Sequence, residues 1–134
     1  MERGLARTVL HRDVAVSYLG KIQSEAIIPE LADLLLRLDG ISWSLCLGER
    51  GNLLLISCRS TARSYKAGTV LRRAIGKDGS AGGHRGMAGG QAPLNGRKPD
   101  ERKELATKLI TRFLRVIKRE GTQPRPIFCA EKAA

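Results

Sequence analysis

The chain has 134 residues, which suits one domain and leaves little room for two. Its 24 Lys and Arg against 13 Asp and Glu give a net charge of +11, which favours polyanionic partners such as nucleic acid, nucleotides or polyphosphate. Aromatic residues make up 4% of the chain, which argues against a module that stacks bases on exposed rings and favours contacts to phosphates. The alternative is that the basic residues only solvate helix faces.

The cysteines and the hydropathy pattern argue against two further classes of protein. Three cysteines without a CxxC spacing argue against a zinc ribbon, and Cys46 and Cys58 lie in apolar runs typical of buried thiols in a reducing compartment. No apolar run approaches the ~20 residues that span a bilayer, and the start of the chain has no hydrophobic signal core. We therefore expect a cytoplasmic protein with no membrane partner.

The first forty residues predict two strands and a helix. Residues 1–8 are expected to be frayed, residues 8–10 to form a strand or an extended lead-in, and residues 13–19 to form a buried strand. Pro29 is tolerated in a first helical turn, and Gly40 is predicted to end the helix as a left-handed cap. Between them, leucines with the spacing of one apolar helix face stand at Leu31, Leu34, Leu35 and Leu38.

The middle of the chain predicts a β-hairpin followed by a helix. Residues 41–47 and 53–59 are apolar runs joined by polar turn formers at 48–52. Residues 66–75 carry apolar side chains on one side and basic side chains on the other, and Gly76 follows them. This pattern predicts a short amphipathic helix that ends at the glycine.

A glycine-rich segment and a long helix complete the pattern. Residues 79–90 hold six glycines and are predicted to form a loop. A helix is predicted over about 99–120 with Gly121 as its cap, and residues 127–128 are a candidate final strand within the tail 122–134. The order of the elements predicts an α/β fold, a single domain in which a mixed β-sheet of about five strands is packed with helices.

The glycine segment carries the first candidate site. Gly82 and Gly83 can adopt positive φ, which would let consecutive backbone N–H groups converge on an anion. His84 and Arg85 add side-chain donors beside them, and a histidine in this position can also protonate a leaving oxygen. The alternative is a mobile loop with an incidental histidine. A P-loop is excluded because Asp78 stands where that motif needs Ser or Thr, and no GxGxxG opens a helix after a strand.

A second candidate site lies at the carboxyl end of the strand predicted at 53–59. Ligands of open α/β sheets gather at such strand ends. Arg59 can hold a phosphate with two parallel N–H bonds, and Ser60 adds a hydroxyl. A solvated strand end is the alternative. Arg63 and Lys66 either extend this basic patch or are solvated surface charges.

No catalytic residue and no metal ligand is predicted in this chain. His11 and His84 are the only histidines, the acids are scattered, and no nucleophile has an adjacent base. His11 is expected to be structural or exposed. Asp13 is expected at a strand edge and Asp33 on a helix surface.

These features together resemble the DHH-associated C-terminal domain of the DHH phosphoesterases. The family's glycine run ending in His is matched by residues 82–89 (GGHRGMAG), and its upstream strand ending in Arg-Ser is matched by Arg59 and Ser60. Residues 34–43 are similar to the family's helix-to-strand passage. Two departures are Ala81, where many members have Gly, and Met87, where many have Ala.

The resemblance covers about residues 9–94 and implies a domain over residues 9–121. Its motif core is residues 53–94, and the predicted C-terminal helix closes it. The family includes single-strand exonucleases, oligoribonucleases, cyclic-dinucleotide phosphodiesterases and exopolyphosphatase-related proteins. RNA, DNA, nucleotides and polyphosphate therefore all stay open as substrates.

The resemblance also implies how the work is divided between domains. Arg59, Gly83 and His84 would bind the substrate phosphate opposite a manganese centre, with Ser60, Gly82 and Arg85 completing the set of phosphate-binding residues. The manganese ligands and the Asp-His-His motif belong to an N-terminal DHH domain, which we expect in the same or a companion chain. This chain would then need no cofactor of its own and would be inactive alone. The alternative function is a stand-alone basic RNA-binding module.

Overall fold

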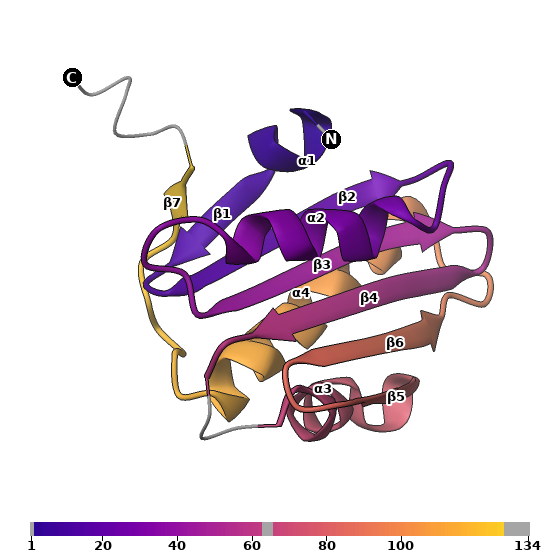
Figure 1. The fold of residues 1–134 in the computed structure, drawn as a ribbon. Coiled ribbons are helices and arrows are strands. Elements are labelled where there is room, and N and C mark those ends of the chain that lie inside the picture. The colour runs from indigo at the N-terminus through magenta and orange to yellow at the C-terminus, as the bar shows by residue number, and fades with distance from the viewer. Residues whose placement is uncertain (1, 63–65, 128–134) are drawn as a thin grey trace.

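Seven strands pair into one sheet in the computed structural model, which describes residues 2–62 and 66–127 (Figure 1). The strands are β1 (Thr8–His11), β2 (Val14–Lys21), β3 (Trp43–Arg50), β4 (Leu53–Ser60), β5 (Ser80–Gly83), β6 (Met87–Pro93) and β7 (Arg125–Pro126). The helices are α1 (Glu2–Ala6), α2 (Ile27–Leu36), α3 (Ala67–Ile75), the 3-10 turn η1 (Gly76–Asp78) and α4 (Pro99–Val116). The order across the sheet is β5-β6-β4-β3-β2-β1-β7.

The sheet is mixed, and it is wider than the sequence predicted. Only β2 and β3 run parallel among the described strands, and α2 makes the crossover between them. The prediction of a single α/β domain with a mixed sheet is confirmed. The prediction of about five strands is wrong because the glycine segment, predicted as a loop, forms β5 and the first half of β6.

Helices cover both faces of the sheet (Figure 1). On one face α2 packs over β2, β3 and β4, where Leu31, Leu35 and Cys46 are buried. On the other face α3 and α4 cover a larger core, in which the rings of Trp43 and Phe113 meet edge to face with their centroids 5.6 Å apart. The apolar faces predicted for the first two of these helices therefore face the core, with Leu31 and Leu35 buried in α2 and Val70, Leu71 and Ala74 in α3.

The central hairpin follows the prediction. Strands β3 and β4 pair from Trp43 opposite Ser60 to Arg50 opposite Leu53. A two-residue turn joins them, and its first residue, Gly51, has a φ of 60°. Glycine is favoured there because tight hairpin turns need a positive φ at this position.

The N-terminal segment, expected to be frayed, is ordered as α1 and the start of β1. Gly4 lies so close to α2 that a Cβ on it would be 2.6 Å from Leu31 Cδ2. The Gly4 carbonyl accepts hydrogen bonds from Thr8 Oγ1 at 2.7 Å and from Ser17 Oγ at 3.0 Å. These tertiary contacts, rather than local helix propensity, hold so short a helix.

Two helices end before the glycines that were predicted to cap them. Helix α2 ends at Leu36 and α4 at Val116, whereas Gly40 and Gly121 lie four to five residues further on with φ of 79° and 76°. Both glycines therefore serve later turns. A different residue adopts the left-handed conformation at the C-terminal end of α4.

The left-handed residue after α4 is Lys118, with a φ of 61°. The Arg119 N–H donates to the Leu114 carbonyl at 2.6 Å, and the Lys118 N–H donates to the Arg115 carbonyl at 3.1 Å. This pair of bonds is a Schellman motif, in which the left-handed position usually holds glycine. The exposed Lys118 occupies it at a steric cost.

The glycine segment forms a β-hairpin and not the predicted loop. Strands β5 and β6 pair from Ser80 opposite Gln91 to Gly83 opposite Ala88. None of the six glycines in residues 79–90 has a positive φ. Glycine is required here for close approach instead, since a Cβ on Gly83 would lie 2.2 Å from the Met87 carbonyl oxygen.

The tail closes the opposite edge of the sheet. Strand β7 pairs with β1, with Pro126 opposite Val9, and the Ile127 N–H donates to the Thr8 carbonyl at 3.3 Å. The last described strand thus lies at residues 125–126, and Ile127 is in the turn that follows it. Phe128 and Arg63, for which the sequence also made predictions, lie outside the described residues. Across residues 2–62 and 66–127 no helix has the length and apolar character needed to cross a bilayer.

Candidate phosphate-binding site

Arg59 lies near the end of β4, on the face of the sheet that α2 covers. Only 8% of the residue is exposed, so a solvated strand end is excluded. Its Nε donates to Asp33 Oδ1 of α2 at 2.7 Å, and its Nη1 donates to the Cys58 carbonyl at 3.0 Å. The predicted helix-surface residue Asp33 therefore fixes the guanidinium, whose Nη2 makes no hydrogen bond to any residue that the structure describes.

Ser60 has a structural task in this arrangement. Its backbone N–H donates to the Gly86 carbonyl at 2.9 Å, which holds the β5–β6 turn against the end of β4. Its hydroxyl accepts a hydrogen bond from the Ala62 N–H at 2.9 Å. The hydroxyl predicted to bind phosphate is thus engaged in the turn that follows β4.

His84 shares a sheet face with Arg59. Its N–H donates to the Met87 carbonyl at 2.8 Å, which extends the β5–β6 ladder by one pair. Met87 in turn pairs with Arg59 on β4. Because directly paired residues project to the same face, Arg59 and Met87 form a row from β4 to β6, and His84 continues it at the start of the β5–β6 turn. Two strand spacings separate its ends, which is about 10 Å between backbones.

The sheet face around this row is open. Met87 is 50% exposed and is the one exposed large hydrophobic residue in the described part of the chain. Gly82 pairs with Gly89 beside it, and a Cβ built on Gly82 meets nothing within 4 Å. Helix α2 therefore leaves β5 and β6 accessible on this side, with donor side chains at one end of the open strip.

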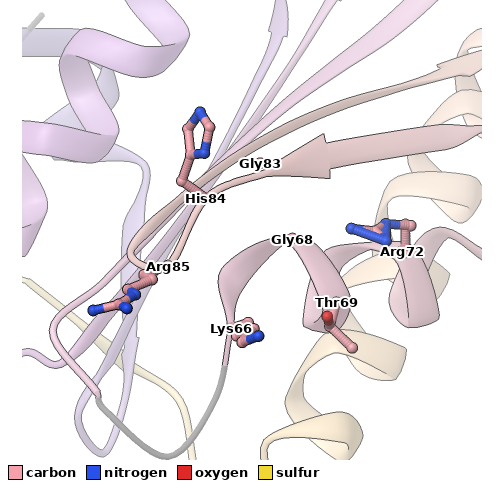
Figure 2. Close-up of a pocket in the computed structure, with 7 residues that line it drawn as sticks. All are labelled: Lys66, Gly68, Thr69, Arg72, Gly83, His84 and Arg85. Atoms are coloured by element: carbon pink, nitrogen blue, oxygen red, sulfur yellow. The ribbon is translucent and has the colours of Figure 1, made fainter.

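A pocket lies on the other side of β5, between the start of α3 and the β5–β6 turn (Figure 2). Its volume is about 250 Å³. The lining residues are Lys66, Gly68, Thr69, Arg72, Gly83, His84 and Arg85. Figure 2 shows the imidazole of His84 pointing away from Lys66 and Thr69, so the turn that ends β5 has the pocket on one side and the open sheet face on the other.

The structure therefore divides the predicted phosphate-binding residues between two places. Gly83, His84 and Arg85 come together at the pocket, whereas Arg59 is buried beside α2, in line with His84 across β6. The convergent backbone nest predicted for the two glycines does not form, because successive N–H groups of an extended strand point in opposite directions.

Sequence reasoning missed Arg72, which it assigned to the solvent face of a helix. Helix α3 has no acidic residue in its first turn, and its N-cap residue is Lys66. A helix start of this composition is itself an anion-binding pattern that the sequence displays. That signal points to Lys66 at the helix start, whereas Arg72 lies in the last turn of α3 and is not marked by it.

Neither a metal centre nor an activated nucleophile is found in residues 2–62 and 66–127. No group of three or more His, Cys, Asp or Glu side chains there could hold a metal ion. Burial raises the pKa of Cys58 to about 12, and burial likewise raises the pKa of Cys46, so neither thiol is a ready nucleophile. His11 is half-buried on β1, and its Nδ1 has no hydrogen-bond partner among the described residues.

Two acids outside the site, Asp13 and Glu49, are engaged in ion pairs. Asp13 accepts two hydrogen bonds from Arg119, at 2.7 and 3.0 Å, and this pairing holds the pKa of the Asp13 carboxyl below its usual range despite some desolvation. Glu49 accepts from Tyr18 and from Arg102. Asp13 is thus a structural partner at the end of a strand, as its predicted strand-edge position suggested.

A search of curated proteins finds one relative with a long match. The chain is 32% identical over 116 residues to the uncharacterized protein MJ1633 of Methanocaldococcus jannaschii. The match covers 83% of this chain and 23% of the relative. The chain thus spans about a quarter of the length of that relative.

Solved structures show the same fold at low sequence identity. An exopolyphosphatase-related protein from Bacteroides fragilis superposes with a TM-score of 0.52 at 16% identity, over 80% of this chain and 31% of that one. The pGpG-specific phosphodiesterase PggH from Vibrio cholerae superposes with a TM-score of 0.50 at 8% identity, over 80% and 36%. These likenesses concern the fold.

The range of residues that matches a protein family contains the whole candidate site. Residues 11–116 match the DHHA1 domain, and this range contains the row from Arg59 to His84 and every residue of the pocket. The match spans all the described strands of the sheet except β1, which it enters at its last residue, and β7. The chain belongs to the DHHA1 domain family.

Proposed function

We propose that this chain is the substrate-binding domain of a DHH-family phosphoesterase, and that it holds a phosphate of a nucleic acid or nucleotide. The observation that carries the proposal is the row of Arg59, Met87 and His84, which runs from beside α2 onto the open part of the sheet face. The row offers two nitrogen donors at its ends and an exposed apolar side chain between them. A docked domain can cover such a surface while the donors hold the substrate.

The two donors suit a phosphate group. The Arg59 guanidinium is held by Asp33 with its Nη2 still available, so little side-chain freedom is lost when it binds an anion. The imidazole of His84 donates from the other end of the row. Gly82 and Gly89 leave room for the ligand to approach the backbone between them.

The catalytic step would belong to a DHH domain in the same or a companion chain. Because the described residues offer no cluster of metal ligands, the manganese expected for this family would be bound there. The greater length of the Methanocaldococcus jannaschii relative agrees with a second domain. The names of the two structural neighbours, both concerned with phosphate chemistry, agree with a phosphate ligand.

Binding of a 5′-phosphorylated dinucleotide to wild type and two variants tests this proposal. His84→Ala removes one donor, and Arg59→Lys keeps the charge but removes the planar fork. Each should weaken binding by about 1–3 kcal/mol, or about 5- to 150-fold, because His84→Ala removes a phosphate donor and Arg59→Lys loses the guanidinium geometry that Asp33 fixes. Arg115→Ala is the matched control, since Arg115 is exposed in the last turn of α4. Thermal unfolding of each variant shows whether the fold is retained.

Two results would contradict the proposal. If His84→Ala binds as tightly as Arg115→Ala, net charge carries the affinity, and the chain acts as a basic RNA-binding module. If the chain alone hydrolyses the dinucleotide efficiently with manganese present, it contains a catalytic centre of its own.

A further inference from the structure

We propose that the pocket between α3 and the β5–β6 turn, here called the α3 pocket, binds a second phosphate of an extended phosphodiester chain. The α3 pocket is the one lined by Lys66, Gly68, Thr69, Arg72 and Arg85 together with the turn. The inference rests on the proposed function, which places the first phosphate at His84 and Arg59. It narrows the substrate to a single-stranded oligonucleotide and disfavours a mononucleotide.

The first argument is uncompensated charge. The side chains of Lys66, Arg72 and Arg85 make no ion pair and no hydrogen bond with any residue that the structure describes. No acidic residue lines the α3 pocket. By contrast, Arg102, Arg112 and Arg119 all pair with carboxylates elsewhere on the surface. Three clustered cations that repel one another are expected where an anion binds.

The second argument is the backbone around the α3 pocket. A Cβ on Gly68 would lie 3.0 Å from the Gly83 nitrogen and 3.3 Å from Arg72 Nη2, so the helix start, the edge strand and the guanidinium converge at one point. Because the His84 N–H pairs with β6, the alternation of the ladder directs the Gly83 N–H to the free edge of β5. A backbone donor and a helix start therefore face the same space as the cations.

The third argument is the position of the α3 pocket relative to the open sheet face. Strand β5 is the edge strand, and the pocket lies beyond that edge. His84 points to the open face while its neighbour Arg85 lines the pocket (Figure 2). An extended chain with one phosphate at His84 would reach the α3 pocket with a later phosphate by passing around the β5–β6 turn.

A length series of ligands tests the inference. Competition binding compares the 5′-phosphorylated deoxyadenylate monomer, dimer and octamer, with inorganic tripolyphosphate as a separate arm. The proteins are wild type, the double variant Arg72→Ala/Arg85→Ala, His84→Ala, and a charge-matched control, Lys103→Ala/Arg115→Ala on the exposed side of α4. Each titration is repeated over a range of salt concentrations.

The pocket double variant should bind the octamer about tenfold more weakly than the control and bind the monomer within about twofold of wild type. Its salt dependence for the octamer should fall by about 0.7 in log–log slope for each phosphate contact removed. His84→Ala should weaken monomer and octamer alike.

Three outcomes would overturn the inference. Equal losses for monomer and octamer would place Arg72 and Arg85 at the first phosphate, and an octamer affinity equal to that of the control would show that the α3 pocket holds no phosphate. If the double variant loses more affinity for tripolyphosphate than for the octamer, the ligand of the α3 pocket is polyphosphate. If His84→Ala leaves the affinity for every ligand unchanged while the double variant weakens octamer binding, the proposed function fails and the α3 pocket is still an anion site.

Discussion

Two adjacent glycines of β5 provide a sharp test of the fold around the site. Gly83→Ala should destabilise the protein strongly. A Cβ at this position would lie 2.2 Å from the Met87 carbonyl oxygen and 2.6 Å from the Ala88 Cα, which both belong to the paired backbone. Because neither atom can move alone, β5 would have to shift by about 1 Å, which costs about 2–3 kcal/mol as other overpacked sites do.

The neighbouring glycine supplies the control. A Cβ on Gly82 meets nothing within 4 Å, and the φ of Gly82 is not in the left-handed region. Gly82→Ala should therefore be neutral or stabilise by about 0.4–1 kcal/mol, because alanine loses less backbone freedom on folding.

Thermal unfolding by circular dichroism distinguishes the two variants. For a chain of 134 residues, 1 kcal/mol corresponds to about 3–4 °C in Tm. Gly83→Ala should lower the Tm by about 7–11 °C, and Gly82→Ala should raise it by up to about 4 °C. A Gly83→Ala protein with the Tm of wild type would refute the close packing of β5 against β6, and so would equal losses in both variants.

The remaining predictions concern stability away from the site. Lys118→Gly should raise the Tm by about 3–4 °C because it relieves about 1 kcal/mol of strain from the left-handed backbone conformation. Lys118→Ala keeps this strain and should leave the Tm unchanged. Equal increases in Tm for both variants would show that the loss of the lysine charge is the cause. Asp13→Asn should reduce the fall in stability that accompanies a decrease in pH in the acid range. The pKa of Asp13 is lowered by its hydrogen bonds to Arg119, so the stability it contributes is fully present above the unfolded pKa near 3.9 and is lost as the pH falls through the folded value. A Tm profile between about pH 2 and pH 6 that is unchanged in Asp13→Asn would contradict this.

The elements that the sequence predicted well are those with a local signal. The β3–β4 hairpin was predicted because two β-rich runs flank a turn that contains Gly51. The apolar face of α2 follows from the spacing of its leucines. In both cases the pattern that forms the element lies within the element itself.

The elements that were missed depend on distant partners. Strand β5 has the sequence SAGG, with no β-branched residue, and it exists because β6 and α3 pack against it. Its glycines read as a flexible loop because sequence alone does not distinguish a glycine needed for positive φ from one needed for close approach. Helix α1 likewise depends on the packing of Gly4 under Leu31.

The candidate site was predicted in part for the same reason. His84 and Arg85 were singled out from local chemistry, and the structure places them at one turn. The ion pair of Arg59 with Asp33 joins residues 26 positions apart, so the buried state of Arg59 could not be foreseen. Arg72 was missed because the periodicity of a helix shows which of its sides faces the core, but it does not show that the polar side of α3 lines a pocket beside β5.

The pairing of β1 with β7 has a consequence for synthesis of the protein. Val9 lies opposite Pro126, so in the described part of the chain the outer edge of β1 pairs with residues that are translated about 120 positions later. At typical elongation rates this separation corresponds to about 6–24 s on the ribosome. During that interval the nascent chain carries an uncovered β1 edge, which is the kind of surface that chaperones engage and that pairs wrongly with other nascent chains.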